Sequence, residues 1–389
     1  MPSNMTESLS TPAAARWPFT RVNISRALAV LLLLPMLGSG TATAERVRIG
    51  VSAPLSGVQA SSGNDVVSHL RAAVGELNEK GEFGTHQVDL VVVDDAYDPA
   101  RTRSNVNTLL RDHGVQLLMA QIGSANIAAA LEAARGTGVT LYAPLAGPSA
   151  LYDDAMRPAV VTLRASYADE VRQQERQLKA MGRTRIAVVY QEDAYGQDIL
   201  AAWRQVRSDQ IQLVSEQAVR RGEPNPLQAV DAAMATQPDA VVLALVASPA
   251  KVAAQRIRTS STGAVIPVLM SAAITSEVIT ELTSPGRGIV LFSSVVPLPG
   301  GASSGSPLLL REYSAFRERH RLKPSVRGLE AYVAVRALAM QLRRMRVVSP
   351  QALGSALAAT PSFTVADLTL RTREPRYSDV FAIARVGVL

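Results

Sequence analysis

QIGSANIAAALEAARGTGVTLYAPLAGPSA, residues 121–150, is the stretch that decides the fold. Its pattern predicts a turn, a helix that begins at Ser124, a short strand over 139–143 and a second turn at Leu145-Ala146-Gly147. Both turns then follow strands, at the edge where open parallel sheets bind their ligands. The helix start brings the Ser124 hydroxyl and the first free backbone N–H groups to one place, which suits a carboxylate or another small anion.

The same alternation of strand and helix continues on both sides of this stretch. Uninterrupted apolar strands are typical of parallel sheets that are covered on both faces. The series restarts after residue 163, so we predict an α/β protein with two doubly wound lobes. Helices resume at 308–320 and 329–346, after the Pro/Gly/Ser-rich loop 297–307. Strands are predicted at 47–52, 88–93, 115–120, 139–143, 160–163, 185–190, 211–216, 240–245, 265–270, 288–295, 365–370 and 380–384.

The first 44 residues have the pattern of a cleavable signal peptide. Three arginines precede a short apolar core at 27–37, and Ala42-Thr43-Ala44 is a small-x-small cleavage site. That core is about half the length needed to span a bilayer. We therefore expect the mature chain to begin at Glu45 and not to insert into a membrane.

Charge and cysteine content narrow the function further. The formal net charge is +7, but the basic residues are dispersed and do not alternate with aromatic residues, so no nucleic-acid partner is expected. The sequence contains no cysteine, which excludes disulfides, thiolate metal sites, a cysteine nucleophile and a lipid-modified cysteine. An exported chain without a lipid anchor indicates the periplasm of a Gram-negative cell.

Several isolated patterns could carry chemistry, but a structural interpretation is stronger for each. GASSG at 301–305 matches G-x-S-x-G, yet it lies in a loop rather than between a strand and a helix, so a secreted hydrolase is a weak alternative. The four histidines lack zinc spacing. Asp94, Asp95 and Asp98 could hold a hard cation, but Asp98 caps a helix and the other two end a strand. We therefore expect no enzyme activity, metal or cofactor.

The remaining candidates are turns at the carboxyl ends of the predicted strands. If the two lobes face each other, six such turns meet at one cleft and bind a small molecule. The candidate ligand-binding residues are Ser56, Ser62, Gly123, Ser124, Leu145, Ala146, Gly147, Tyr195, Val246 and Ala272.

Several motifs together resemble a known family. The APLSG turn, VVVDDAYDPARTRSNVNTLL, GS-x-x-x-AAA, VTLYAPLAG, LRASYADE and VVYQEDAYGQDIL look like type I periplasmic binding proteins, and in particular the leucine/isoleucine/valine-type solute receptors of ABC importers. The resemblance covers roughly 46–384. It implies two Rossmann-like lobes joined by three crossover strands near Leu163, Leu291 and Thr364. Lobe one would comprise 45–163 plus 292–346, and lobe two 164–291 plus 347–389.

The resemblance also implies roles for single residues. A serine at the position of Ser124 and a hydroxyl residue after the next turn hold the ligand carboxylate in amino-acid-binding members, but the second position here is Gly147. Tyr195 matches a tyrosine of the second lobe. Ser62 and Val246 replace aromatic residues, and Ala272 replaces the acid that holds the α-ammonium.

These departures affect the expected ligand. A buried ammonium without a counter-charge costs several kcal/mol, so a small carboxylate or amide is at least as plausible as a branched-chain amino acid. The implied partner is the membrane permease of an ABC importer. A ligand sensor or scaffold with the same fold, without transport, is the alternative.

Overall fold

The structure is a computed structural model that describes residues 45–206, 210–261, 263–283, 288–299, 306–372 and 379–384. The expected leader and the GASSG segment lie outside the described residues. Within these ranges, no helix combines the length and the apolar character that crossing a membrane requires.

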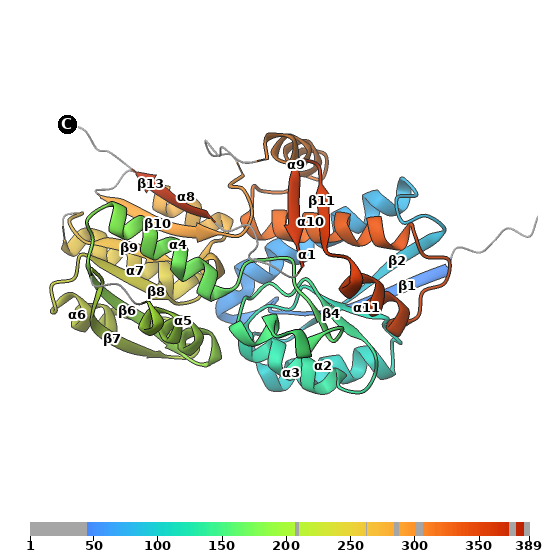
Figure 1. Cartoon of the computed structure of the whole chain (residues 1–389), viewed down its shortest axis with the longest axis horizontal. Coiled ribbons are helices and arrows are strands. Elements are labelled where there is room, and N and C mark those ends of the chain that lie inside the picture. Colours follow the sequence, from blue (N-terminus) through green and yellow to red (C-terminus); the bar gives the residue numbers. More distant parts are fainter. Residues whose placement is uncertain are drawn as a thin grey trace, which may run out of the picture. The chain divides into compact units, whose positions relative to one another are not determined.

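The first sheet has five parallel strands in the order β2-β1-β3-β4-β5. Helix α1 (Ala60–Glu79) packs against β2 and against α10 (Val326–Leu342), while α2 (Pro99–Arg111) packs against β1, β2 and α3 (Ser124–Ala134). Figure 1 shows these helices in two layers around the sheet. The strands are β1 (Glu45–Ala53), β2 (His86–Asp94), β3 (Leu117–Met119), β4 (Thr140–Tyr142) and β5 (Val160–Val161).

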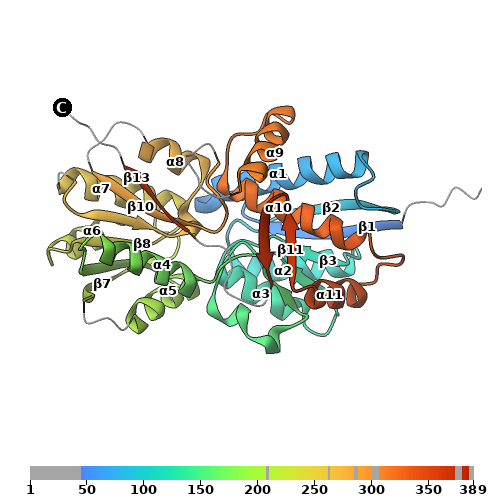
Figure 2. The same cartoon turned by 45° about the horizontal axis from the view of Figure 1, so that its top comes forward.

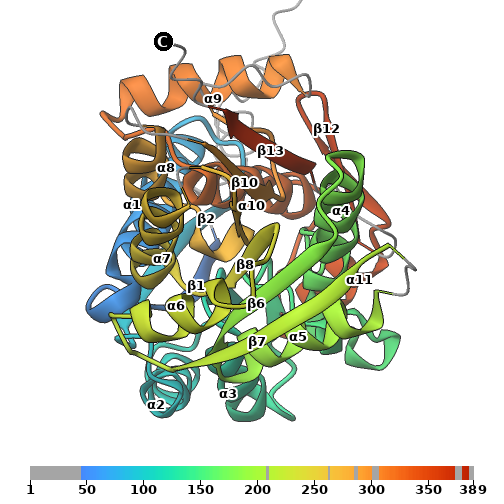
Figure 3. The same ribbon diagram turned by 90° about the vertical axis from the view of Figure 1, so that its left-hand side faces the viewer.

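The second sheet has six strands in the order β13-β10-β9-β8-β6-β7. Five are parallel, but the last strand of the chain, β13, pairs antiparallel with β10, a feature that the sequence pattern did not predict. Figure 3 shows β7, β6 and β8 side by side. The strands are β6 (Arg185–Glu192), β7 (Gln212–Arg220), β8 (Ala240–Ala244), β9 (Ile266–Leu269), β10 (Ile289–Ser294) and β13 (Asp379–Ala384).

Helices also cover this second sheet on both faces. On one face, α4 packs against β10 and β13, and α5 packs against β6 and β8. On the other face, α6 packs against β6 and β7, and α7 packs against β8 and β9. The helices are α4 (Tyr167–Ala180), α5 (Ala194–Gln205), α6 (Leu227–Met234), α7 (Ala247–Ser260) and α8 (Ser276–Thr283).

Side-chain caps explain where several helices begin. The Asp98 carboxylate accepts from the Ala100 N–H at 2.8 Å, with Pro99 at the first helical position. Ser166 and Asp169 form the predicted capping box at the start of α4. Ser349 and Pro350 give the same signal for α11 (Pro350–Ala359), a helix that the sequence analysis missed.

The end of the chain differs from the expectation. The single strand predicted at 365–370 is a hairpin of β11 (Ser362–Val365) and β12 (Leu368–Arg371). The reversal is made at Ala366, which adopts a left-handed backbone with φ of 54°. The hairpin packs beside α10 (Figure 2).

These contacts shift the expected lobe boundaries. Helix α11 packs against β3, β4 and β5, so it lies with the first sheet and not with lobe two. Strand β10 continues to Ser294, so the second crossing follows Ser294 rather than Leu291. The third crossing lies between β12 and β13 rather than at Thr364. The fold class itself, two α/β lobes each built on a parallel sheet, is confirmed.

Candidate ligand-binding site

The carboxyl ends of strands from both sheets meet at the interface between the lobes. The short helix η2 (Gly57–Gln59), which follows β1, contacts α7, which follows β8. Helix α3, which follows β3, contacts α5, which follows β6. The loops that the sequence analysis selected on the two lobes therefore come together in the folded chain.

Nine of the ten predicted site residues are buried. Ala146 from the first lobe shares one apolar cluster with Tyr195, Val246 and Ala272 from the second. Leu145 belongs to the neighbouring apolar cluster. Ser56 is the exception: it is exposed, and its hydroxyl donates to Asp94 Oδ2 at 2.6 Å. Ser56 therefore differs from the other nine in being exposed.

Four uncharged polar side chains gather at the carboxyl edge of the first sheet. We call Gln59, Ser62, Gln121 and Ser124 the edge cluster; none is more than 4% exposed. Within the described part of the chain, Gln59 Oε1, Ser62 Oγ and both Gln121 amide atoms have no partner, whereas the Ser124 hydroxyl lies within hydrogen-bonding reach of Tyr167. Because β1 and β3 are neighbours, residues that follow them lie at the same edge. Buried polar atoms are normally hydrogen-bonded, so this group is suited to a bound polar molecule.

The backbone before Ser124 explains how α3 starts. Gly123, with φ of 95°, is the residue that precedes the helix, and Ser124 is the first helical residue rather than its cap. A Cβ at Gly123 would lie 2.6 Å from Cε2 of Tyr97, so only glycine fits there. The prediction that the helix begins at Ser124 is therefore confirmed. The Ser124 hydroxyl stands beside the first N–H groups of the helix and within hydrogen-bonding reach of the Tyr167 phenol.

Two tyrosines line the second lobe's side of the same interface. The Tyr195 and Tyr167 rings make an edge contact with centroids 5.2 Å apart, and the Tyr195 hydroxyl donates to the Leu245 carbonyl at 3.4 Å. Burial raises the pKa of Tyr167 to about 12, against a smaller opposite effect of Arg164. Both phenols are therefore neutral hydrogen-bonding groups at physiological pH.

The backbone around Gly147 explains the missing hydroxyl residue at this position. The Tyr167 N–H donates to the Gly147 carbonyl at 2.7 Å. A Cβ at Gly147 would lie 2.7 Å from the Ala165 carbonyl oxygen and 3.2 Å from Ser166 Cα. The crossing segment thus occupies the space that a serine or threonine side chain would need.

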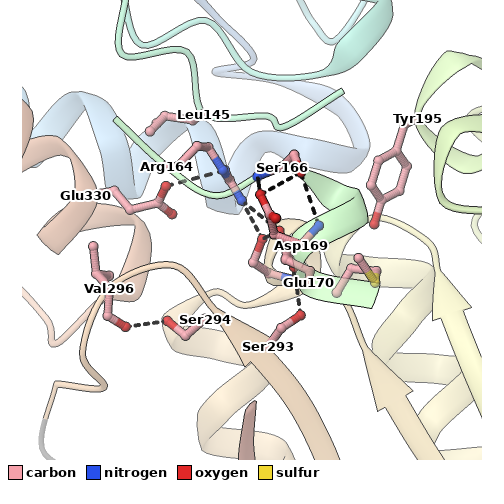
Figure 4. A network of polar contacts seen from close by, with 12 residues as sticks. Leu145, Arg164, Ser166, Asp169, Glu170, Tyr195, Ser293, Ser294, Val296 and Glu330 are labelled. Atoms are coloured by element: carbon pink, nitrogen blue, oxygen red, sulfur yellow. Dashed lines mark hydrogen bonds and ion pairs between the residues drawn. The ribbon is translucent and has the colours of Figure 1, made fainter. Parts of the chain in front are cut away.

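A buried charge network lies where the chain first crosses between the lobes (Figure 4). We call Arg164, Glu170, Arg327 and Glu330 the hinge network. Arg164 Nη2 is 3.3 Å from Glu170, and its Nη1 is 3.3 Å from Glu330. Arg327 Nη1 is 3.2 Å from Glu330 and donates to the Leu145 carbonyl at 3.0 Å. Two positive and two negative charges cancel in a region that excludes water.

Glu170 is held by more than its arginine. Its carboxylate accepts from the Ser271 N–H at 3.0 Å, the Ser271 hydroxyl at 2.7 Å and the Ser293 hydroxyl at 2.7 Å. Burial acts to lower the pKa of Arg164, but Glu330 and Glu170 outweigh it and raise that pKa above its ordinary value. An acid does lie beside Ala272, therefore, but its bonds are already made within the protein. Sequence reasoning missed this network because it joins two short segments, 164–170 and 327–330, that are far apart in the chain.

A second set of contacts joins the lobes at Arg221, after β7. We call Arg221, Tyr97 and Asn126 the latch. Arg221 Nη2 donates to Asn126 Oδ1 at 2.9 Å and to the Tyr97 carbonyl, and the guanidinium carbon lies 4.1 Å from the centre of the Tyr97 ring. Asp193 holds Arg221 Nη1 at 2.8 Å. These bonds cross from the second lobe to the first.

Asp94, the last residue of β2, and Asp95 shape the loop that follows this strand. Asp94 accepts from the Leu55 and Ala96 N–H groups, each at 2.8 Å, and Asp95 accepts from Ser52, Thr102 and the Tyr97 N–H. No group of three or more metal-ligating side chains occurs among the described residues. The two carboxylates thus hold the loop that carries Tyr97 to the latch.

The sequence model of the periplasmic binding proteins matches residues 46–377. The chain belongs to this family. It is similar to a Leu/Ile/Val-binding protein homolog 2 of Brucella abortus, with 35% identity over 105 residues. That alignment covers 27% of this chain and 28% of the relative, so the match spans little more than a quarter of the relative's length.

Solved structures show the same two-lobed fold. A possible leucine/isoleucine/valine-binding protein from Rhodopirellula baltica is 25% identical, with a TM-score of 0.75 over 88% of this chain and 94% of that one. A solute-binding protein of an ABC transporter from R. palustris, solved with benzoate, is 15% identical, with a TM-score of 0.73 over 86% and 92%. The second likeness concerns the fold alone.

Proposed function

We propose that this chain is the periplasmic solute-binding component of an ABC importer. It holds a small ligand between its lobes and presents the closed form to a membrane permease. The observation that carries the proposal is the edge cluster: four buried polar side chains, three of them with unpartnered atoms, at the edge where η2 and α3 contact helices of the second lobe. Family membership and the relatives named as Leu/Ile/Val-binding proteins support the same function.

On this proposal, the latch is one of the contacts that hold the two lobes closed over the ligand. Arg221 makes bonds that exist only when its turn lies against Tyr97 and Asn126 of the other lobe. A ligand that binds both lobes shifts the population toward this closed state. Ser149 makes a second interlobe contact, because its N–H and hydroxyl donate to Asp198 Oδ2 at 3.1 and 3.2 Å.

The ligand falls within branched-chain amino acids and related small carboxylates or amides. Ser124 and the α3 N–H groups bind its carboxylate or carbonyl oxygen, and Tyr195 contacts it from the second lobe. The fold alone does not choose among these ligands, since the R. palustris protein of the same fold was solved with benzoate.

The proposal is tested by ligand binding coupled to closure. Thermal-shift screening against amino acids, carboxylates and amides identifies ligands, and small-angle scattering with and without each one measures compaction. We expect at least one ligand to raise the melting temperature and to remove any open population. Binding without a change in the lobe arrangement would favour a sensor or scaffold, and stimulation of the cognate importer's ATPase distinguishes transport.

A further inference from the structure

We infer that the site recognises a small neutral ligand that carries an amide group, rather than a zwitterionic amino acid or a carboxylate. This inference rests on the proposed function and names the ligand class of the same site. It follows from two observations: every buried acid already has partners in the protein, and the unpartnered buried atoms of the edge cluster are both donors and acceptors.

The acids of the described residues exclude an ammonium group. Only Asp95, Glu170 and Glu330 are buried. Arg164 and Arg327 neutralise the two glutamates, and Asp95 accepts bonds from Ser52, Thr102 and the Tyr97 N–H. Asp193 is paired with Arg221. A buried α-ammonium would therefore find no free counter-charge, and its desolvation would be uncompensated.

Gln121 argues against a carboxylate. Its side chain is fully buried, and both Nε2 and Oε1 are unpartnered, so it offers one donor and one acceptor whichever way the amide is turned. Gln59 Oε1 adds a second acceptor. An ionised carboxylate has no hydrogen to give these oxygens, whereas an amide has both an N–H and a carbonyl.

Charge balance points the same way. The buried hinge network sums to zero, although Arg164 Nε and Arg327 Nε have no hydrogen-bond acceptor there. A neutral carbonyl oxygen can accept from such N–H groups and leaves the charge balanced, whereas an anion would add an uncompensated buried negative charge. The start of α3 and the Ser124 hydroxyl donate to a carbonyl oxygen as well as to a carboxylate. The facing side chains Val246, Ala272 and Tyr195 are apolar or aromatic, so they suit a short aliphatic or aromatic body.

Three compounds with one carbon skeleton provide the test: 4-methylpentanamide, 4-methylpentanoate and leucine. Calorimetry on the purified full chain should give the amide at least tenfold tighter binding than either of the others. Benzamide against benzoate and propanamide against propanoate extend the comparison to other sizes. Equal or tighter binding of the carboxylate or of leucine, or silence of every amide, overturns the inference.

The outcomes separate this inference from the proposed function. If leucine or a carboxylate binds and closes the lobes while the amides are silent, the amide inference fails and the solute-binding function stands. If no amide, carboxylate or amino acid binds or changes the scattering, both fail.

Substitutions locate the binding to the edge cluster. Gln121→Glu keeps the shape but removes the amide donor, and we expect it to weaken amide binding at least tenfold. Gln205→Glu makes the same change on the exposed end of α5 and should leave affinity unchanged. If Gln121→Glu does not fold, Gln59→Leu is the second test, because we expect it to weaken amide binding as well. Unaltered amide affinity in both folded edge variants would contradict the assignment.

Discussion

The hinge network and the edge cluster are both polar and both buried, yet they differ in their bonding. The four hinge residues carry full charges, and each is paired with a partner of opposite charge. The four edge residues are neutral, and Gln59, Ser62 and Gln121 carry atoms without a partner; the hinge arginines also have unpartnered N–H groups, but their charges are balanced. The comparison indicates a division of labour: paired charges hold the crossing between the lobes, and uncharged groups remain available to a ligand.

Breaking the hinge network should have the largest effect. Arg164→Met leaves Glu170 and Glu330 buried without their shared cation, which costs about 3–5 kcal/mol of the free energy of unfolding. Urea denaturation measures this loss. Arg172→Met, at an arginine 61% exposed beside Asp169, is the matched control and should cost less than about 1 kcal/mol. A similar small loss for both variants would show that the hinge charges do not stabilise the fold.

A side chain at Gly147 should have the second largest effect on the free energy of unfolding. Gly147→Ser places a Cβ against the Ala165 carbonyl oxygen at 2.7 Å, so the crossing segment must move, at a cost of about 1–3 kcal/mol. Thermal denaturation followed by circular dichroism measures the change. Gly75→Ser in α1 is the control, since a Cβ there meets nothing within 4 Å. A Gly147→Ser protein as stable as the parent would refute this steric explanation.

Opening the latch should have a smaller effect, on binding rather than on folding. Arg221→Ala removes the ion pair with Asp193 within the second lobe, and also the interlobe bonds and the contact with the Tyr97 ring. The interlobe contacts are together worth about 1 kcal/mol or somewhat more. We expect about a fivefold to tenfold loss of ligand affinity, mainly through faster dissociation. Stopped-flow binding separates the two rates. The control is Arg220→Ala, at a residue whose side chain is 82% exposed; it should change neither the association rate nor the dissociation rate of the ligand.

The smallest effect on stability is expected at the edge cluster. Gln121→Leu replaces two unpartnered buried atoms with an apolar group of similar size, so the free energy of unfolding should stay the same or rise by about 1 kcal/mol. Urea denaturation of the ligand-free protein tests this directly. A loss of several kcal/mol would mean that Gln121 has a structural role like that of Arg164, and the contrast between the two regions would fail.

Much of the fold could be predicted because each signal was local. Apolar strands such as β8 need no distant partner to be recognised, and caps such as Asp98 and Ser166 mark helix starts within a few residues. Helix α11 begins with a capping serine followed by proline, like the Asp98-Pro99 start of α2, and could have been found. The pairing of β13 could not, since its direction depends on β10, far earlier in the chain.

The site was predictable only in part, because several of its contacts depend on residues that are distant in the sequence. Strand-end positions pointed to Ser62 and Ser124, which are buried, while the buried glutamines Gln59 and Gln121 follow the same strands but were not selected. The clash that requires glycine at 147 depends on the backbone of the crossing segment. The partners of Arg164 come from α4 and α10, and nothing in the local sequence pairs them.

The C-terminal part of the chain contributes elements to both sheets, and this arrangement also affects how the protein folds. Helices α10 and α11 cover the first sheet, and β13 completes the second by pairing Ala384 with Ile289. Neither lobe is therefore a continuous piece of chain: the first is completed by α10 and α11, and the second by β13. Such distant pairings make folding slow and cooperative. A truncation before Asp379 should thus destabilise the second lobe and leave the edge of β10 open to pairing with other molecules.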